Sequence, residues 1–170
     1  MPRRSRKNNF RRKRRFLPLI VGAVILLGLF SFTQGKVVKV SDGDTLDVLD
    51  SSGELVTVRL YGVDCPEYMQ DGGPEALEHT RELALMKKVK LTVFYEDQYG
   101  RKVALVHLPD GKILNRELLR GGHAWVYENY CKESFCDDWR AAQKQARREK
   151  KGLWKQKSPQ APWNWRKRNN

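Results

Sequence analysis

The sequence predicts an α+β domain built on a small five-stranded β-barrel with three α-helices. Three short segments with strand-like hydrophobicity follow one another through tight turns, which favours a meander over βαβ units. Two more strand-like segments and three helical segments follow before residue 154. A long apolar segment precedes them and is predicted as an additional N-terminal helix.

The first three strands are predicted over residues 37–40, 45–49 and 56–61. In the third, Val56, Val58 and Leu60 alternate with more polar neighbours, the period of a half-buried strand. Turn-forming residues at 41–43 and 50–53 separate the three segments.

The later elements are two strands and three helices. The strands are predicted over residues 90–95 and 103–108, and the helices over residues 74–87, 116–120 and 134–149. Pro74 suits the first helical position, Asn115 is expected to cap the second helix, and Gly122 to end it. Five strands and three helices in this order fit a barrel of the OB type.

Charge divides the chain into segments. The net charge is +13, but residues 1–15 carry nine Lys or Arg and no acid, which leaves 24 basic and 20 acidic residues in the rest. The main domain, predicted over residues 36–154, is therefore only mildly basic, which is compatible with a polyanionic partner. The basic, Trp-containing tail, residues 155–170, is predicted to have no fixed fold.

Residues 16–35 are predicted as a signal peptide or a signal-anchor transmembrane helix. Residues 16–32 contain no charge, a length at the lower limit for a membrane span and long for a cleaved signal. The basic residues before them place the N-terminus in the cytoplasm and the domain outside it, in the cell envelope, periplasm or medium. Cleavage after Gly35 and membrane anchoring through residues 16–33 both remain open.

Three cysteines are compatible with an oxidising compartment. Cys131 and Cys136 are five residues apart and could close a small loop as a disulfide, with Cys65 left over. No pair of histidines lies near them, which argues against a zinc site.

Three acids follow predicted strands, and this grouping favours a metal site. Asp44, Asp64 and Glu67 would each be a turn or loop acid if taken singly. Together they supply the carboxylate oxygens that a hard cation such as Ca²⁺ prefers, and no nearby histidine suggests a transition metal.

Two arginines complete the parts that phosphodiester hydrolysis needs. The guanidinium groups of Arg59 and Arg101 can bind a phosphate with two parallel hydrogen bonds. A metal can polarise the phosphoryl oxygen, the cations can stabilise the developing charge, and a carboxylate can orient the attacking water.

The motifs that carry these residues resemble the staphylococcal-nuclease-like, or thermonuclease, family over residues 36–154. They are Asp42-Gly43-Asp44-Thr45, Arg59-Leu60-Tyr61-Gly62-Val63-Asp64-Cys65-Pro66-Glu67, Asp97-Gln98-Tyr99-Gly100-Arg101, Asn115, Gly122-His123-Ala124 and Gly152-Leu153-Trp154. The resemblance implies an OB-fold barrel with three helices. It also implies a Ca²⁺-dependent nuclease, a metal-dependent phosphodiesterase that acts on DNA and RNA and leaves 3′-phosphates.

By position, the resemblance implies a metal site with four contributors. Asp44 and Asp64 would bind Ca²⁺ through their carboxylates, and Cys65 through its backbone carbonyl. Asp42 would support the site without touching the ion. The Cys65 thiol can then be inert.

The remaining roles follow in the same way. Glu67 would position or activate the attacking water, and Arg59 and Arg101 would bind the scissile phosphate. Tyr99 and Tyr127 are expected to contact the substrate.

Two positions depart from the best-known member of the family. Gln98 replaces a lysine, and Glu128 replaces a tyrosine of the nucleotide pocket, for which Tyr127 or Tyr130 could substitute. His123 is expected to be a packing residue.

A membrane-tethered or secreted OB-fold module that binds nucleic acid without cutting it is the alternative function. Because all five expected charged side chains are present, cleavage is the preferred prediction. The protein is expected to be a monomer.

Overall fold

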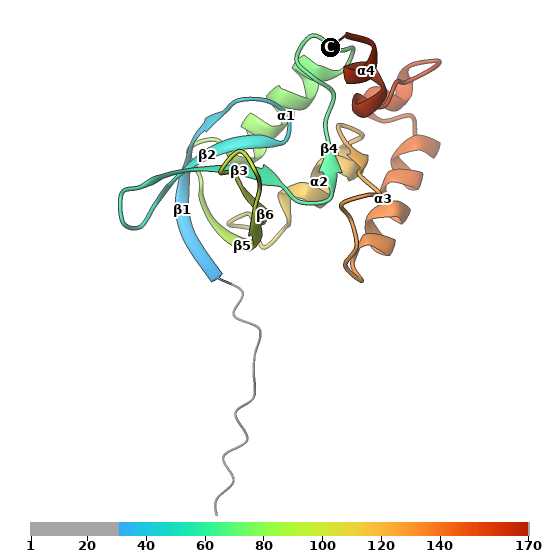
Figure 1. The fold of residues 1–170 in the computed structure, drawn as a ribbon. Coiled ribbons are helices and arrows are strands. Elements are labelled where there is room, and N and C mark those ends of the chain that lie inside the picture. The colour runs from blue at the N-terminus through green and yellow to red at the C-terminus, as the bar shows by residue number, and fades with distance from the viewer. Residues whose placement is uncertain (1–30, 170) are drawn as a thin grey trace, which may run out of the picture.

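A closed five-stranded barrel forms the centre of the protein in the computed structural model, which describes residues 31–169 (Figure 1). The order around the barrel is β1 (Ser31–Val40), β2 (Thr45–Asp50), β3 (Leu55–Leu60), β6 (Lys102–His107) and β5 (Lys88–Glu96). The predicted barrel and its five strands are confirmed.

The register of the barrel follows from its connections. Strands β1, β2 and β3 form an antiparallel meander joined by tight turns. Strand β5 pairs antiparallel with both β1 and β6 and so closes the barrel. Strand β3 pairs with β6 in parallel, which places the turn before β6 beside the start of that pairing.

Helices and a second small sheet cover one side of the barrel. The helices are α1 (Gly73–Ala84), α2 (Leu114–Gly121), α3 (Cys136–Arg148) and α4 (Pro162–Asn169), with a 3₁₀ turn, η1 (Gly152–Lys155). A two-stranded sheet pairs β4 (Val63–Asp64) with β7 (Trp125–Val126). The three predicted helices are present with shifted ends, whereas α4, β4 and β7 were not predicted.

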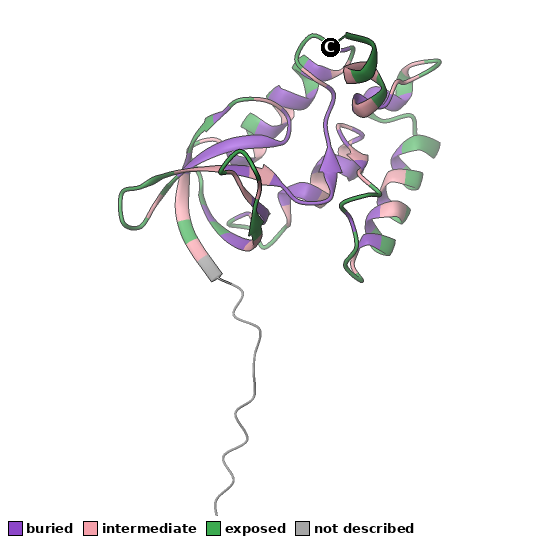
Figure 2. Cartoon of the chain, viewed as in Figure 1, coloured by how far each residue is buried: buried purple, intermediate pink, exposed green. Residues whose placement is uncertain are grey.

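Buried residues of the strands form a core that continues into the helical side (Figure 2). Trp139 of α3 is 1% exposed and belongs to the same core cluster as the barrel residues. The fully buried strand residues include Val37, Leu46, Val48, Val58, Leu60, Leu91 and Val106. A disulfide joins Cys131 to Cys136 at the start of α3, with 5.8 Å between their Cα atoms.

Asn115 is not a helix cap, contrary to the prediction. Helix α2 begins one residue earlier, and its N-cap is Ile113. The buried Asn115 amide accepts a hydrogen bond from the Val106 N–H and donates to the carbonyls of Tyr61 and Ala104. The side chain therefore satisfies backbone groups of β6 and of the residue after β3, which sequence spacing does not reveal.

Residues 155–169 of the tail are ordered, so the prediction of no fixed fold was wrong for them. Helix α4 begins with Pro162, whose fixed φ suits the first turn. Ala161 and Pro162 are buried, and Trp163 lies against Trp125 and Tyr127. These tertiary contacts stabilise a helix that has no apolar stripe of its own.

The predicted N-terminal helix falls mostly on residues 16–30, which lie outside the described residues, as does the basic segment 1–15. Its last part differs from the prediction, because residues 31–35 belong to β1 and pair with β5. Between residues 31 and 169, none of the helices has both the length and the hydrophobicity of a membrane span.

The backbone of Gly122, just after α2, lies against the backbone of Gly152, the first residue of η1. Gly122 has φ 76°, and its carbonyl accepts a hydrogen bond of 2.9 Å from the Leu153 N–H. A Cβ at Gly122 would overlap the carbonyl oxygen of Lys151. This contact fixes the end of α2 against the start of the C-terminal segment.

We predict that Gly122→Ala lowers the free energy of unfolding by at least about 3 kcal/mol, because it adds overpacking to a left-handed backbone. Gly111→Ala is the matched control, since Gly111 has φ 82° and open space around it. It should cost about 1 kcal/mol. Urea unfolding of the full-length chain in mild detergent measures both values, and equal losses would contradict the packing argument.

His123 is a packing residue whose ring stacks on that of His79, with centroids 4.3 Å apart. Burial, followed by the charges of His79 and Lys155, lowers the pKa of His123 to about 4. Between pH 6.5 and 4 the unfolded chain therefore binds a proton that the folded chain does not.

Stability should consequently fall as the pH decreases from 6.5 to 4, and His123→Gln should reduce that fall. Thermal unfolding at several pH values compares the two proteins. The same slope in wild type and variant would show that His123 does not contribute.

Candidate active site

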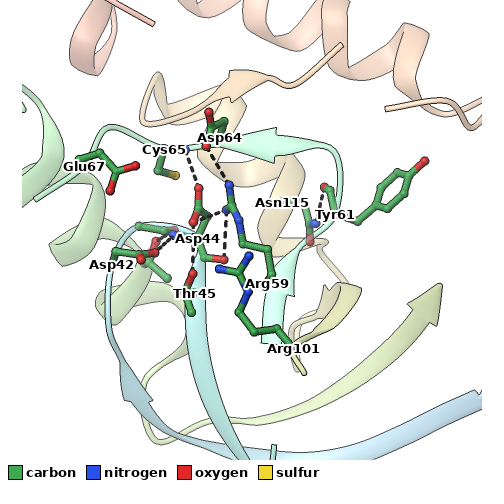
Figure 3. Close-up of polar contacts among 12 residues, drawn as sticks. Asp42, Asp44, Thr45, Arg59, Tyr61, Asp64, Cys65, Glu67, Arg101 and Asn115 are labelled. Atoms are coloured by element: carbon green, nitrogen blue, oxygen red, sulfur yellow. Dashed lines mark hydrogen bonds and ion pairs between the residues drawn. The ribbon is translucent and has the colours of Figure 1, made fainter. Parts of the chain in front are cut away.

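Arg59 lies between two buried carboxylates (Figure 3). Its Nη1 pairs with Asp44, and its Nη2 donates to Oδ1 of Asp64 at 2.8 Å. The side chains of Asp44 and Asp64 are 7% and 1% exposed, and that of Arg59 is 15% exposed. The three residues form a largely water-excluded ion cluster at the end of the barrel.

Neighbouring strands and turns hold the two aspartates. Asp44 precedes β2, and its N–H donates to the carboxylate of Asp42 at 2.9 Å. Oδ2 of Asp44 accepts the Cys65 N–H at 2.7 Å, which links the β2 turn to the loop after β4. Asp64 ends β4 and pairs with Trp125 of β7.

The electrostatics of the cluster are dominated by burial. Desolvation, and then the charge of Asp44, raises the pKa of Asp42 to about 7. Desolvation also raises the pKa of Asp64, although Arg166 and Arg59 act against it. Burial opposes the charge of Arg59, but its acidic neighbours outweigh burial and raise the pKa of Arg59. The raised pKa values of Asp42 and Asp64 thus reflect mainly their removal from water.

Cys65 is packed into the core of the protein. Its side chain is 4% exposed, and burial raises the pKa of the thiol well above its usual value. The thiol is the free one, since the other two cysteines are bonded to each other.

Glu67 lies at the rim of the site on a tightly held loop. Its side chain is 35% exposed, and its carbonyl accepts the Gln70 N–H at 2.8 Å. A Cβ at Gly73 would overlap that same carbonyl, so only glycine permits α1 to begin here. The loop between β4 and α1 therefore holds Glu67 beside Asp64 through its backbone.

Arg101 is held within its own turn. Its Nε donates to Asp97 at 2.8 Å, its N–H donates to the same carboxylate, and the guanidinium lies 5.3 Å from the centre of the Tyr99 ring. Figure 3 shows its side chain directed toward Arg59. Asp97, predicted only as a turn residue, is the positioning partner of Arg101.

Arg166 was not predicted and comes from α4. Its Nη2 pairs with Oδ2 of Asp64 at 2.8 Å, and its Nη1 pairs with Oε1 of Glu67 at 2.7 Å. The sequence offers one indirect signal, an arginine within a Trp-rich segment that a helix could bring to an acidic site.

A pocket of about 650 Å³ brings these residues together. All predicted catalytic, metal-binding and substrate-contacting residues line it, together with Arg166. They are Asp42, Asp44, Arg59, Asp64, Cys65, Glu67, Tyr99, Arg101 and Tyr127. Tyr99 is 73% exposed, whereas one face of Tyr127 stacks on Trp163, with centroids 5.5 Å apart. Glu128 does not line the pocket and pairs with Arg140 instead.

The donor set fits a hard cation. Asp44 and Asp64 offer carboxylate oxygens in a pocket that is lined by more acids than arginines and by no histidine. Within residues 31–169, however, no cluster of at least three His, Cys, Asp or Glu residues is arranged to hold a metal. A cation here would therefore need main-chain or water oxygens in addition to the carboxylates.

Comparison with known proteins agrees with the resemblance seen in the sequence motifs. A family model described as staphylococcal nuclease homologue matches residues 57–156, a range that contains Arg59, Asp64, Glu67 and Arg101 but not Asp44.

Curated relatives are similar over most of the chain. An uncharacterized endonuclease of Escherichia coli O157:H7 is 38% identical over 91% of this chain and 99% of its own length. A micrococcal nuclease of Shigella flexneri is 32% identical over 89% and 92%. An uncharacterized endonuclease of Haemophilus influenzae is 34% identical over 78% and 72%.

We predict different stability effects for the two family arginines. Arg59→Gln leaves two buried carboxylates without this counter-ion and should cost about 3 to 5 kcal/mol. Arg101→Gln removes a partly exposed pair with Asp97 and should cost less than about 1 kcal/mol. Urea unfolding at pH 7 measures both, and similar losses for the two variants would contradict the burial argument.

Proposed function

The chain belongs to the staphylococcal nuclease family, and from this membership we propose that it is an exported, Ca²⁺-dependent nuclease. The proposed reaction is hydrolysis of phosphodiester bonds in DNA and RNA, cutting within the strand and leaving 3′-phosphates. The observation that carries the proposal is a single pocket that contains two arginines, two buried aspartates and a rim glutamate.

Arginines account for binding of the phosphate. A Ca²⁺ ion held by Asp44 and Asp64 would supply positive charge that polarises a phosphoryl oxygen. Arg59 on β3 and Arg101 in the turn before β6, the parallel partner of β3, both line the pocket, so both can donate to the oxygens of one phosphate. Their charges stabilise the negative charge that builds on those oxygens during attack.

Glu67 is the carboxylate that would act on the attacking water. Its carboxylate is partly exposed and lies beside Asp64, bridged to it by Arg166. It can orient a water molecule or accept its proton as the water attacks phosphorus. The bond from phosphorus to the 5′-oxygen then breaks. The 5′-oxygen takes up one proton, which balances the proton that the water lost, and the products are a 5′-hydroxyl and a 3′-phosphate.

Aromatic residues provide for sequence-tolerant substrate binding. Tyr99 and Tyr130 are exposed and line the pocket. Bases of any identity can stack on such rings, and nothing in this mode of binding separates DNA from RNA.

Export is proposed from the basic and apolar N-terminal sequence. A cut after Gly35 would remove five of the six residue pairs between β1 and β5, and the barrel would lose much of its closure. We therefore propose that the mature chain keeps these residues. Mass spectrometry of the exported protein tests this, because an N-terminus at Lys36 would contradict it.

We predict that the purified full-length chain degrades single-stranded DNA with Ca²⁺ and stops when a chelator is added. Glu67→Gln and Arg101→Gln should each reduce the rate at least about 100-fold. Glu128→Gln is the control with an unchanged rate, since Glu128 lies outside the pocket.

A gel assay of labelled DNA and RNA measures these rates. Full activity in chelator would disprove the cation dependence. Tight binding of DNA without cleavage under every divalent cation would instead support the binding-module alternative.

A further inference from the structure

The guanidinium of Arg166 occupies the two carboxylates on which the proposed chemistry depends. Its Nη1 and Nη2 reach Oδ1 and Oδ2 of Asp64 at 3.2 and 2.8 Å, and Nη1 also reaches Oε1 of Glu67 at 2.7 Å. These are three charge-assisted hydrogen bonds from one side chain, the strongest class of hydrogen bond in proteins.

Helix α4 is held in place by contacts other than Arg166. Pro162 is buried, and Trp163 packs between Trp125 and Tyr127. The loop that carries Glu67 also contacts this segment, because the Gln70 side chain donates to the Gln160 carbonyl at 2.7 Å. The position of Arg166 is therefore built into the fold, unlike that of a long side chain on a free surface.

Both carboxylate oxygens of Asp64 already accept hydrogen bonds from arginines. Oδ1 accepts from both Arg59 and Arg166, and Oδ2 accepts from Arg166. A divalent ion bound to either oxygen would lie close to a guanidinium of like charge, beside a carboxylate that is only 1% exposed, where water screens charges poorly. The docked Arg166 and a cation would therefore compete for Asp64.

We propose that Arg166 is a positioning residue of the active site that holds Asp64 and Glu67 in the cation-free enzyme and yields Asp64 to the cation. The free energy of its two hydrogen bonds to Asp64 is lost when the cation binds, so Arg166 sets the cation concentration at which the enzyme works. The inference rests on the proposed function for the role of Asp64 as a ligand. It goes beyond that function in assigning the C-terminal helix to the site.

Calorimetric titration of the full-length chain with Ca²⁺, in mild detergent at pH 7, tests the proposal. Arg166→Gln should bind Ca²⁺ at least about tenfold more tightly than wild type, because no hydrogen bonds to Asp64 need to break first. Arg168→Gln is the matched control. It removes the same charge from the same helix, and Arg168 is exposed with no ion pair among the described residues.

Two additional measurements separate competition from a folding defect. Thermal unfolding in chelator checks that Arg166→Gln is folded, and a small loss of stability is expected because Asp64 and Glu67 lose a partner. Arg166→Lys keeps the charge but not the fork, so its Ca²⁺ affinity should lie between those of wild type and Arg166→Gln.

The outcomes are distinguishable. Equal Ca²⁺ affinity in Arg166→Gln and Arg168→Gln, or weaker affinity in Arg166→Gln, overturns the inference while the proposed nuclease stands. If neither wild type nor Arg166→Gln binds Ca²⁺, Mg²⁺ or Mn²⁺, the cation dependence fails and the inference fails with it.

Discussion

The burial of ionised carboxylates around Arg59 is the constraint on which the rest of the site depends. Removing an ion from water carries a penalty of several kcal/mol, so Asp44 and Asp64 can remain charged only with a counter-ion in contact. Arg59 meets this need from β3, the strand that lies between the two acids in sequence. Burial, and then the charge of Asp44, raise the pKa of Asp42 beside this cluster. The cluster is thus stable in the fold yet still attracts further positive charge.

Topology explains how distant residues meet at this cluster. The parallel pairing of β3 with β6 places the turn of Arg101 beside the strand of Arg59. Asn115 then fixes this junction, because its amide bonds the backbone of both segments. Helix α4 adds a contribution from the far end of the sequence. The site is consequently a property of the closed barrel and its helical side together, since no single segment contains enough of it.

The sequence predicted the parts that depend on local pattern. Alternation at Val56 and Val58 and the turn residues between strands located the barrel, and the charged motifs located Asp44 and Arg101. Features that depend on tertiary contacts could not be predicted in this way. Helix α4 has no apolar periodicity, and the start of β1 continues an apolar run without a boundary signal. Asn115 was wrongly predicted as a helix cap because asparagine is used both for helix caps and for buried side-chain hydrogen bonds to the backbone.

The disulfide between Cys131 and Cys136 determines which part of the structure relaxes first when it is reduced. Its loop is so short that the cross-link contributes only about 2 kcal/mol in a chain-entropy estimate, and its influence is local. That locality matters because Cys131 packs against Gly62, between Arg59 and Asp64, and the Gly62 carbonyl accepts the Tyr127 N–H. Under reducing conditions the barrel would persist while the wall around Tyr127 and Tyr130 relaxed first. Reduction of the disulfide would therefore change substrate binding before it changed the fold.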